Sequence, residues 1–265
     1  MSSKFGNGCF DSDSGYGFGS GFGSGGGESV LAPPPRIEGV RAALRRLDDG
    51  SPCLVVQFGV PCAALSSGVV GGGFLADCSA VVNRQVLKSY MSDDPEAELQ
   101  SLLARNGFDR YGTLGFMTAA YVSDVGFAEH EIGSGTGRYA AVWATVGLGN
   151  AARAGRLREP SGGLFPGTIN IVAVVDGDLA PGAFVGAAVV AAEAKASALA
   201  ELGARDPDDG GAATGTTTDA LAIVATGRGA PSRYAGTATH VGHAVGRAVY
   251  DAVLAAGRRY AARAR

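Results

Sequence analysis

The chain has 265 residues, 46% of them hydrophobic, and a formal net charge of −3. This length and composition allow one large domain with an apolar core, or two small ones. The sequence has no basic stripe that would favour nucleic acid, and its basic C-terminus, GRRYAARAR, suits the negative end of a helix dipole.

The N-terminal sequence lacks the basic and apolar regions of a signal peptide. The long uncharged run at 53–76 is interrupted by a proline, a glutamine, a pair of serines and a triple glycine, so we predict no membrane-spanning helix. We therefore expect a cytoplasmic protein without nucleic-acid or membrane partners. The cysteines have no C-x-x-C spacing and are predicted to be buried free thiols: Cys9, Cys53, Cys62 and Cys78.

Residues 1–35 are rich in glycine, serine and aromatic residues and end in a proline run. Such a segment cannot bury enough apolar surface to order itself, so we predict a disordered tail before a folded domain at 36–265. From Val40 to Leu47 the apolar spacing predicts a helix, although a short strand also fits. The segments 53–60 and 79–87 are predicted strands.

The segment 94–107 is a predicted helix, with Asp94 as N-cap, Pro95 in the first turn and Gly107 at its end. Further strands are predicted at 113–122, 138–148, 168–177 and 219–227, and long helices at 181–203 and 239–260. Because strands come in a run first and alternate with helices later, we predict an α+β fold: a single layered domain of mixed strands with long C-terminal helices.

The loop before the last predicted strand reads ATGTTTDALAIVATG, with one carboxylate among threonines. Alternation along the strand places Asp219, Leu221 and Ile223 on one face, in line with the core. An acid at the mouth of an apolar strand is suited to act as a general base or to orient another group. The alternative is that Asp219 only bonds loop amides and shapes the turn.

Two other strand ends carry polar side chains. Ser66 and Ser67 lie between a strand and glycines, where exposed amides could donate to an oxyanion, or where the serines could cap a turn. Thr168 and Asn170 share one face of an apolar strand, so they must be solvated, hydrogen-bonded or facing a site.

The two long helices carry further candidates. His240, His243, Arg247 and Asp251 share one face of the last helix, which suits either a ligand-facing helix start or an ordinary solvated face. On the preceding helix, Glu193 and Lys195 are two residues apart and are not expected to pair with each other. Glu193, Ser197 and Glu201 form a row that reads as a solvated stripe.

The chain has no nucleophile elbow, phosphate-binding loop or zinc helix, and its glycine-rich stretches at 69–74 and 133–138 lack the context of a dinucleotide site. We therefore expect no metal and no cofactor.

Several segments occur in a recognisable order: LSSGVVGGGF, AVVN, GFMTAA, TVGLGNAARAG, PGTINI, EAKASAL, ATGTTTDALAIVATGRG and YAGTATHVGHAVGRAVYDAV. On these segments the chain resembles the adenosylcobinamide amidohydrolase family, from Cys53 to the C-terminus. The resemblance implies hydrolysis of the amide between the aminopropanol arm and the corrin ring, giving adenosylcobyric acid and 1-amino-2-propanol in cobamide salvage. The corrinoid would be the substrate, not a cofactor.

Hydrolysing such an amide requires a nucleophile, donors for the oxyanion and an acid for the leaving amine. With that implied activity, the acid–base candidates are Asp219, Glu193 and His240. The expected substrate contacts are Ser66, Ser67, Asn83, Thr168, Asn170, Gly215, Thr216, Thr217 and Thr218. The attack could come from water or a side chain, including a threonine freed by self-cleavage at Gly167–Thr168 or Gly215–Thr216.

Two alternatives stay open on the sequence. One is a non-catalytic corrinoid-binding protein, although the D-x-H-x-x-G cobalt-binding motif is absent because Ala238 stands two residues before His240. The other is an amidohydrolase that acts on a different amide.

Overall fold

The computed structural model describes residues 30–31, 35–156 and 167–263. Most of the predicted tail at 1–35 lies outside the described residues. The exceptions include β1 (Val30–Leu31), which pairs antiparallel with β2 (Val40–Arg46). The boundary between tail and domain stays a prediction.

Within the described residues, nine strands form one sheet that bends at β3. Beyond β1 and β2 its strands are β3 (Pro52–Ser66), β4 (Gly73–Gln85), β5 (Thr113–Thr118), β6 (Gly126–Glu131), β7 (Tyr139–Val146), β9 (Ile169–Val175) and β12 (Ala220–Ala225). β3 pairs with β2 along 52–58 and with β12 along 63–66. A register shift between Gln57 and Cys62 marks the bend, so β3 connects two β layers.

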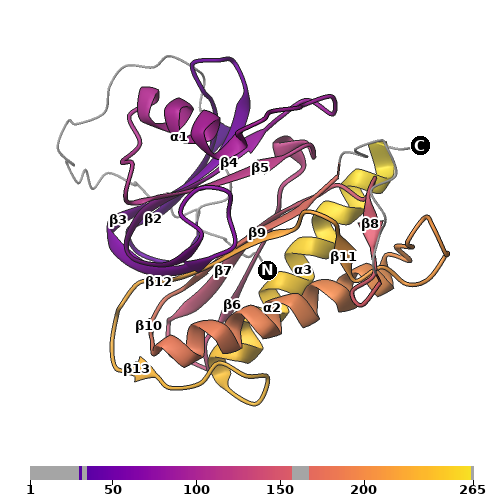
Figure 1. Cartoon of the computed structure of the whole chain (residues 1–265). Coiled ribbons are helices and arrows are strands. Elements are labelled where there is room, and N and C mark those ends of the chain that lie inside the picture. The colour runs from indigo at the N-terminus through magenta and orange to yellow at the C-terminus, as the bar shows by residue number, and fades with distance from the viewer. Residues whose placement is uncertain (1–29, 32–34, 157–166, 264–265) are drawn as a thin grey trace, which may run out of the picture.

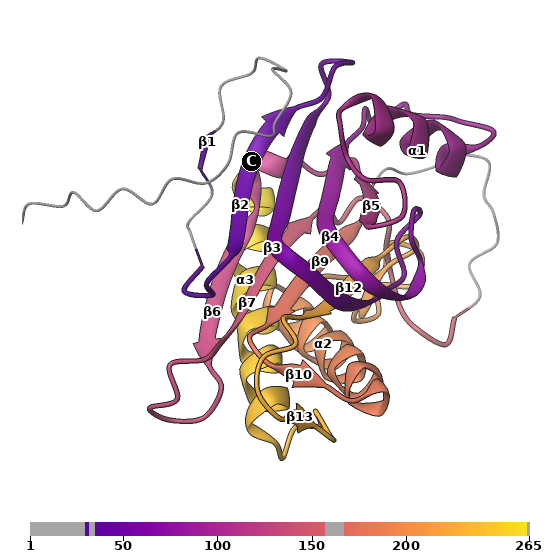
Figure 2. The ribbon, with the colours of Figure 1, turned by 90° about the vertical axis from the view of Figure 1, so that its left-hand side faces the viewer.

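The sheet is covered by helices on both outer sides (Figures 1 and 2). Along β9, Ile169 and Ile171 pack against α2 (Pro181–Glu201) and α3 (His240–Arg263), whereas Val172 and Val174 pack against the layer of β2 to β5. α1 (Pro95–Arg105) covers the outside of that second layer. The order of layers is therefore helix, sheet, sheet, helix, and the predicted α+β class is confirmed.

The predicted helix at 40–47 is wrong, and the alternative strand is what forms. In β2, Val40 and Ala42 are buried while Arg41 between them is exposed, which is the alternation of a strand. Pairing with β3 outweighs the helical spacing of the three larger apolar residues. The edge strand β6 was not predicted; its sequence, GFAEHE, is too polar to read as a strand.

The helix ends agree with the sequence. The Asp94 side chain accepts a hydrogen bond from the Ala97 N–H at 2.9 Å, and Gly107 follows α1 with a φ of +78°. Of the described helices, α2 alone is long and apolar enough to cross a membrane, with a mean hydropathy of 1.5. Ala183, Ala187 and Ala191 on its inner side are fully buried in the core, so this composition serves packing.

Three of the four cysteines are described, and the prediction of buried free thiols is confirmed for Cys53, Cys62 and Cys78. Cys9 lies outside the described residues. Burial raises the pKa of Cys53 and of Cys78 to about 12 and that of Cys62 to about 11. Thiols that stay protonated at neutral pH are poor nucleophiles.

Candidate functional site

The first β layer consists of β6, β7, β9 and β12. One end of this layer gathers the segments that the sequence singled out. β9 and β12 are parallel, with Asn170 opposite Ala220, so both strands begin at this end, and the antiparallel β7 ends there with Val146 opposite Ile169. A pocket of about 560 Å³ opens between α2 and the loop before β12. Its lining residues are Ala152, Arg153, Ala154, Ala192, Glu193, Lys195, Ala196, Thr214, Gly215, Thr216, Thr217 and Asp219.

Asp219 is the most heavily hydrogen-bonded side chain of this pocket. Its carboxylate accepts from the backbone N–H groups of Ile169 and Thr216, both at 3.1 Å, and from the Thr216 hydroxyl. It also forms an ion pair with the Lys195 ammonium. As the alternation predicted, Asp219 points to the same side of β12 as Ile223, towards the helices.

The sequence did not identify Lys195 as a site residue. Its partner, Asp219, is 24 residues away along the chain, and only the packing of α2 on β12 brings them together. The two side chains are 15% and 17% exposed, so the pair is largely removed from water but reachable from the pocket. Gly215 makes room for it, because a Cβ there would lie 2.4 Å from Asp219 Oδ2 and 2.8 Å from Lys195 Nζ.

The loop at 213–219, which we call the threonine loop, is hydrogen-bonded to the segment that follows β7. β11 (Gly215–Thr216) pairs antiparallel with β8 (Ala151–Ala152). The Asn150 side-chain amide donates to the Thr217 hydroxyl at 2.7 Å. These contacts give the pocket a wall made from two segments that lie far apart in the sequence.

A buried polar network lies on the opposite face of β9 and β12. Asn170 donates to the Asn83 side-chain oxygen and to the Met117 carbonyl, both at 2.8 Å, and Asn83 donates to Thr145 at 3.0 Å. Asn83 and Asn170 are each 1% exposed, which places them beneath the site and not in its lining. They satisfy each other between the two β layers.

Thr168 and Thr218 connect that network to the threonine loop. The Thr168 hydroxyl contacts the Asn170 side chain at 3.2 Å and donates to the Thr218 carbonyl at 2.7 Å, and the Thr218 hydroxyl donates to the Gly167 carbonyl at 3.0 Å. The predicted shared face of Thr168 and Asn170 is therefore confirmed, and their contacts are internal.

Ser66 and Ser67 connect β3 to the start of β12. The Ser66 hydroxyl accepts from the Gly68 N–H at 2.9 Å, and the Ser67 hydroxyl accepts from the Leu221 N–H at 3.1 Å. Both serines thus shape the turn in this structure, and neither lines the pocket.

His240 lies at the other end of the β layer from Asp219. It begins α3 beside Gly133, in the connection between β6 and β7, where Ala140 pairs with Val175. His243 is exposed. Further along the same face, Asp251 bonds His130 at 2.8 Å and Arg247 at 2.9 Å, so this face is an ion-pair surface. In the described part of the chain, no group of three or more His, Cys, Asp or Glu side chains could hold a metal.

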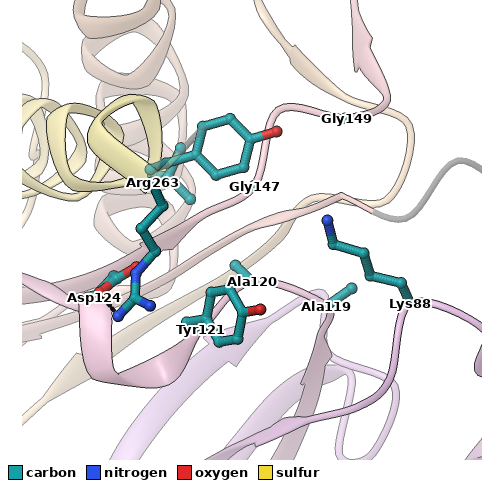
Figure 3. A pocket seen from close by; sticks show the side chains of 10 residues that line it. Lys88, Ala119, Ala120, Tyr121, Asp124, Gly147, Gly149 and Arg263 are labelled. Carbon is teal, nitrogen blue, oxygen red and sulfur yellow. Dashed lines mark hydrogen bonds and ion pairs between the residues drawn. The ribbon is translucent and has the colours of Figure 1, made fainter. Parts of the chain in front are cut away.

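A second pocket, of about 520 Å³, opens near the end of α3 (Figure 3). Its lining residues are Lys88, Ala119, Ala120, Tyr121, Asp124, Val146, Gly147, Gly149, Tyr260 and Arg263. The Arg263 guanidinium pairs with Asp124 and lies 4.7 Å from the centre of the Tyr121 ring. The segment from Gly147 to Asn150 contacts both pockets, since Gly149 lines one and Asn150 bonds Thr217, which lines the other.

Comparison with known proteins identifies relatives of this chain. An adenosylcobinamide amidohydrolase from Halobacterium salinarum is 38% identical over 122 residues, which cover 43% of this chain and 48% of that protein. The PH0078 protein from Pyrococcus horikoshii, a crystal structure, aligns over 87% of this chain and 88% of its own with 13% identity and a TM-score of 0.42, too distant to assign a shared fold. The sequence model of the adenosylcobinamide amidohydrolase family matches residues 40–265, and the chain therefore belongs to that family.

Proposed function

We propose that this protein hydrolyses the amide that joins the aminopropanol arm of adenosylcobinamide to the corrin ring. The products would be adenosylcobyric acid and 1-amino-2-propanol, in corrinoid salvage. The observation that carries the proposal is convergence: the family-like segments around 145–155, 193–199 and 213–219 supply the lining of one pocket.

The lining suits a neutral ligand edged with amides. Thr214, Thr216 and Thr217 carry hydroxyls, and Ala192 and Ala196 add apolar surface. Drug-sized ligands occupy pockets of about 300–1,000 Å³, and a corrinoid is larger than these. The neighbouring pocket beside Gly147–Asn150 offers room for a second part of the same molecule.

The charged groups that line the pocket are two carboxylates, the Lys195 ammonium and the Arg153 guanidinium, which pairs with Asp209. Asp219 and Glu193 are the acid–base candidates there, and Lys195 adds a positive charge beside Asp219. His240, at the far end of the sheet, has no part in the proposal. Water as the nucleophile needs only these groups, and we propose a reaction without added metal or nucleotide.

The test is incubation of the purified protein with adenosylcobinamide, with the products separated by chromatography and identified by mass. We expect equimolar adenosylcobyric acid and 1-amino-2-propanol, undiminished by a chelator. Tight corrinoid binding without release of aminopropanol would instead identify a binding protein. Loss of activity on chelation, restored by zinc, would defeat the metal-free mechanism.

A further inference from the structure

We infer that Lys195 contacts the carbonyl oxygen of the reacting amide, and that Asp219 is a positioning residue that acts through Lys195. This inference rests on the proposed function and divides the roles inside its pocket. It follows from three features of the pocket. The acceptor sites of the Asp219 carboxylate are occupied by internal donors, the Lys195 ammonium has more N–H donors than acceptors within the described residues, and α2 holds that ammonium in place.

The Asp219 carboxylate is occupied by internal donors. A carboxylate has about four lone-pair sites. Asp219 accepts from two backbone N–H groups, those of Ile169 and Thr216, from the Thr216 hydroxyl and from Lys195. A proton taken from water would have to displace one of these donors. The contacts are those of an anchor for the loop and for Lys195.

The Lys195 ammonium, in contrast, has more hydrogen-bond donors than acceptors around it in the described part of the chain. An ammonium carries three N–H donors, and within the described residues its one hydrogen-bond acceptor is Asp219. The side chain lines the pocket and is 15% exposed. Donors that are held near a pocket wall, with little water around them, are suited to a substrate oxygen that gains negative charge.

The position of this ammonium is fixed from both ends. Lys195 lies well inside α2, whose Ala191, Ala198 and Leu199 are fully buried in the core. At the other end, Asp219 is held by backbone N–H groups of β9 and β11. A preorganised charge costs no reorganisation when the reaction occurs, which is the condition for effective stabilisation of an oxyanion.

The reaction balances with water as the only co-reactant. The water oxygen bonds to the carbonyl carbon, and negative charge gathers on the carbonyl oxygen, where Lys195 donates a hydrogen bond. The carbon–nitrogen bond then breaks, and the nitrogen leaves as an amine with the proton that water gave up. Glu193, exposed on the same helix and lining the same pocket, is the carboxylate free to carry that proton. Donating a hydrogen bond preserves the Lys195–Asp219 ion pair, whereas donating the whole proton would destroy it.

The test compares Lys195→Met, Asp219→Asn and the double variant, with kcat and KM measured on adenosylcobinamide. We expect Lys195→Met to lower kcat by about 10²–10³-fold, the usual effect of losing an oxyanion donor, with little change in KM. Asp219→Asn should also lower kcat. Because Asp219 acts through Lys195, the double variant should be no slower than Lys195→Met alone.

The matched control is Arg258→Met, which also removes one positive charge and one ion pair with a residue of α2, Glu201, away from the pocket. It should keep full turnover. Should Lys195→Met melt far below the wild type, Lys195→Arg, which keeps the charge and the ion pair, should stay folded and show a lowered kcat.

The outcomes separate the two proposals. A wild-type protein that releases no aminopropanol defeats the proposed function, and the assignment of Lys195 with it. An active wild type with equally active Lys195→Met defeats only the assignment. A double variant much slower than Lys195→Met would show that Asp219 acts on the substrate by itself.

Discussion

Gly215 is the residue whose lack of a side chain the Lys195–Asp219 pair requires. We predict that Gly215→Ala lowers turnover strongly, because its Cβ would lie 2.4 Å from Asp219 Oδ2 and must push the pair apart. Gly182→Ala on α2 is the control, since nothing lies within 4 Å of a Cβ there. Steady-state kinetics and thermal melts of both variants check this; a fully active Gly215→Ala would mean that the pair tolerates displacement.

At the scale of residues, the sequence predicts side-chain orientations that depend only on adjacent positions in the chain. The orientation of Asp219 follows from strand alternation, and the shared face of Thr168 and Asn170 follows from the same rule. The role of Lys195 could not be predicted, because its neighbours along the helix are mostly alanines and its ion-pair partner, Asp219, comes from another element. Substrate contact by Asn83 and Asn170 stays a prediction, and in the structure the two side chains bond each other. Sequence alone cannot distinguish a polar side chain that faces a ligand from one that pairs with another side chain between two sheets.

At the scale of elements, α1 is held to the β layer by Arg84. Its guanidinium, with the side chain 11% exposed, bonds Glu98 of α1 and Asp49 of the β2–β3 connection, both at 2.7 Å. The hydrogen bond from Arg84 lowers the pKa of Glu98 below its usual 4.5. A carboxylate with a lowered pKa in the folded state contributes stability above its unfolded pKa, and this contribution is lost as the pH falls through the folded value.

We therefore predict that Glu98→Gln melts at a lower temperature than the wild type at pH 7. The difference should shrink as the pH falls below about 4, where the wild-type carboxyl becomes protonated as well. Glu96→Gln, also in the first turn of α1 but exposed, controls for the helix dipole. Melting curves across the pH range measure both; a Glu98→Gln difference that persists unchanged at low pH would contradict the charge argument.

The second pocket gives another prediction at this scale. If part of the corrinoid occupies it, Tyr121→Ala should raise KM for adenosylcobinamide several-fold, since a tyrosine ring offers a large contact area, and leave kcat unchanged. Tyr111→Ala, which removes a more exposed ring (80% against 48%) outside both pockets, should change neither constant. An unaltered KM for Tyr121→Ala would confine the substrate to the pocket beside Lys195.

Elements with strong local signals could be predicted, and those that depend on pairing could not. α1 has a capping aspartate and a terminal glycine, and α2 and α3 are long, so all three were found. β2 carries apolar residues at both helical and strand spacing, and only the ladder with β3 decides between them. β6 is a polar edge strand whose identity comes from β7 beside it.

At the scale of the whole molecule, we predict that the N-terminal segment is dispensable. A truncated chain that begins at Arg36 keeps the core residue Ile37 and the ion pair of Arg36 with Glu129 at 2.8 Å. It loses only the two-residue strand β1 from the described sheet. Melting temperature and turnover should match those of the full chain; a large fall in either would show that residues before Arg36 support the fold or the site.

The layered class of the fold follows from the order of strands and helices, but the stacking of two β layers does not. The central strands of the first layer, β7, β9 and β12, are largely apolar on both faces. From the sequence, such strands could equally be covered by helices on both sides. Only the bend in β3, around Gly59 and Pro61, folds one part of the sheet over the other. That bend also brings Asn83 of one layer next to Asn170 of the other, which forms the buried asparagine network.

Because β3 belongs to both layers, the two β layers cannot separate from each other as independent units. Separating β3 from β12 exposes one layer and weakens the other, since β4 pairs with β3 on both sides of the bend, at 53–57 and at 62–66. Amide hydrogen exchange should therefore find one cooperative unit, in which the slowest amides of β3, β9 and β12 exchange only through global unfolding. The pocket, built where these strands meet, would then persist until the entire fold is lost.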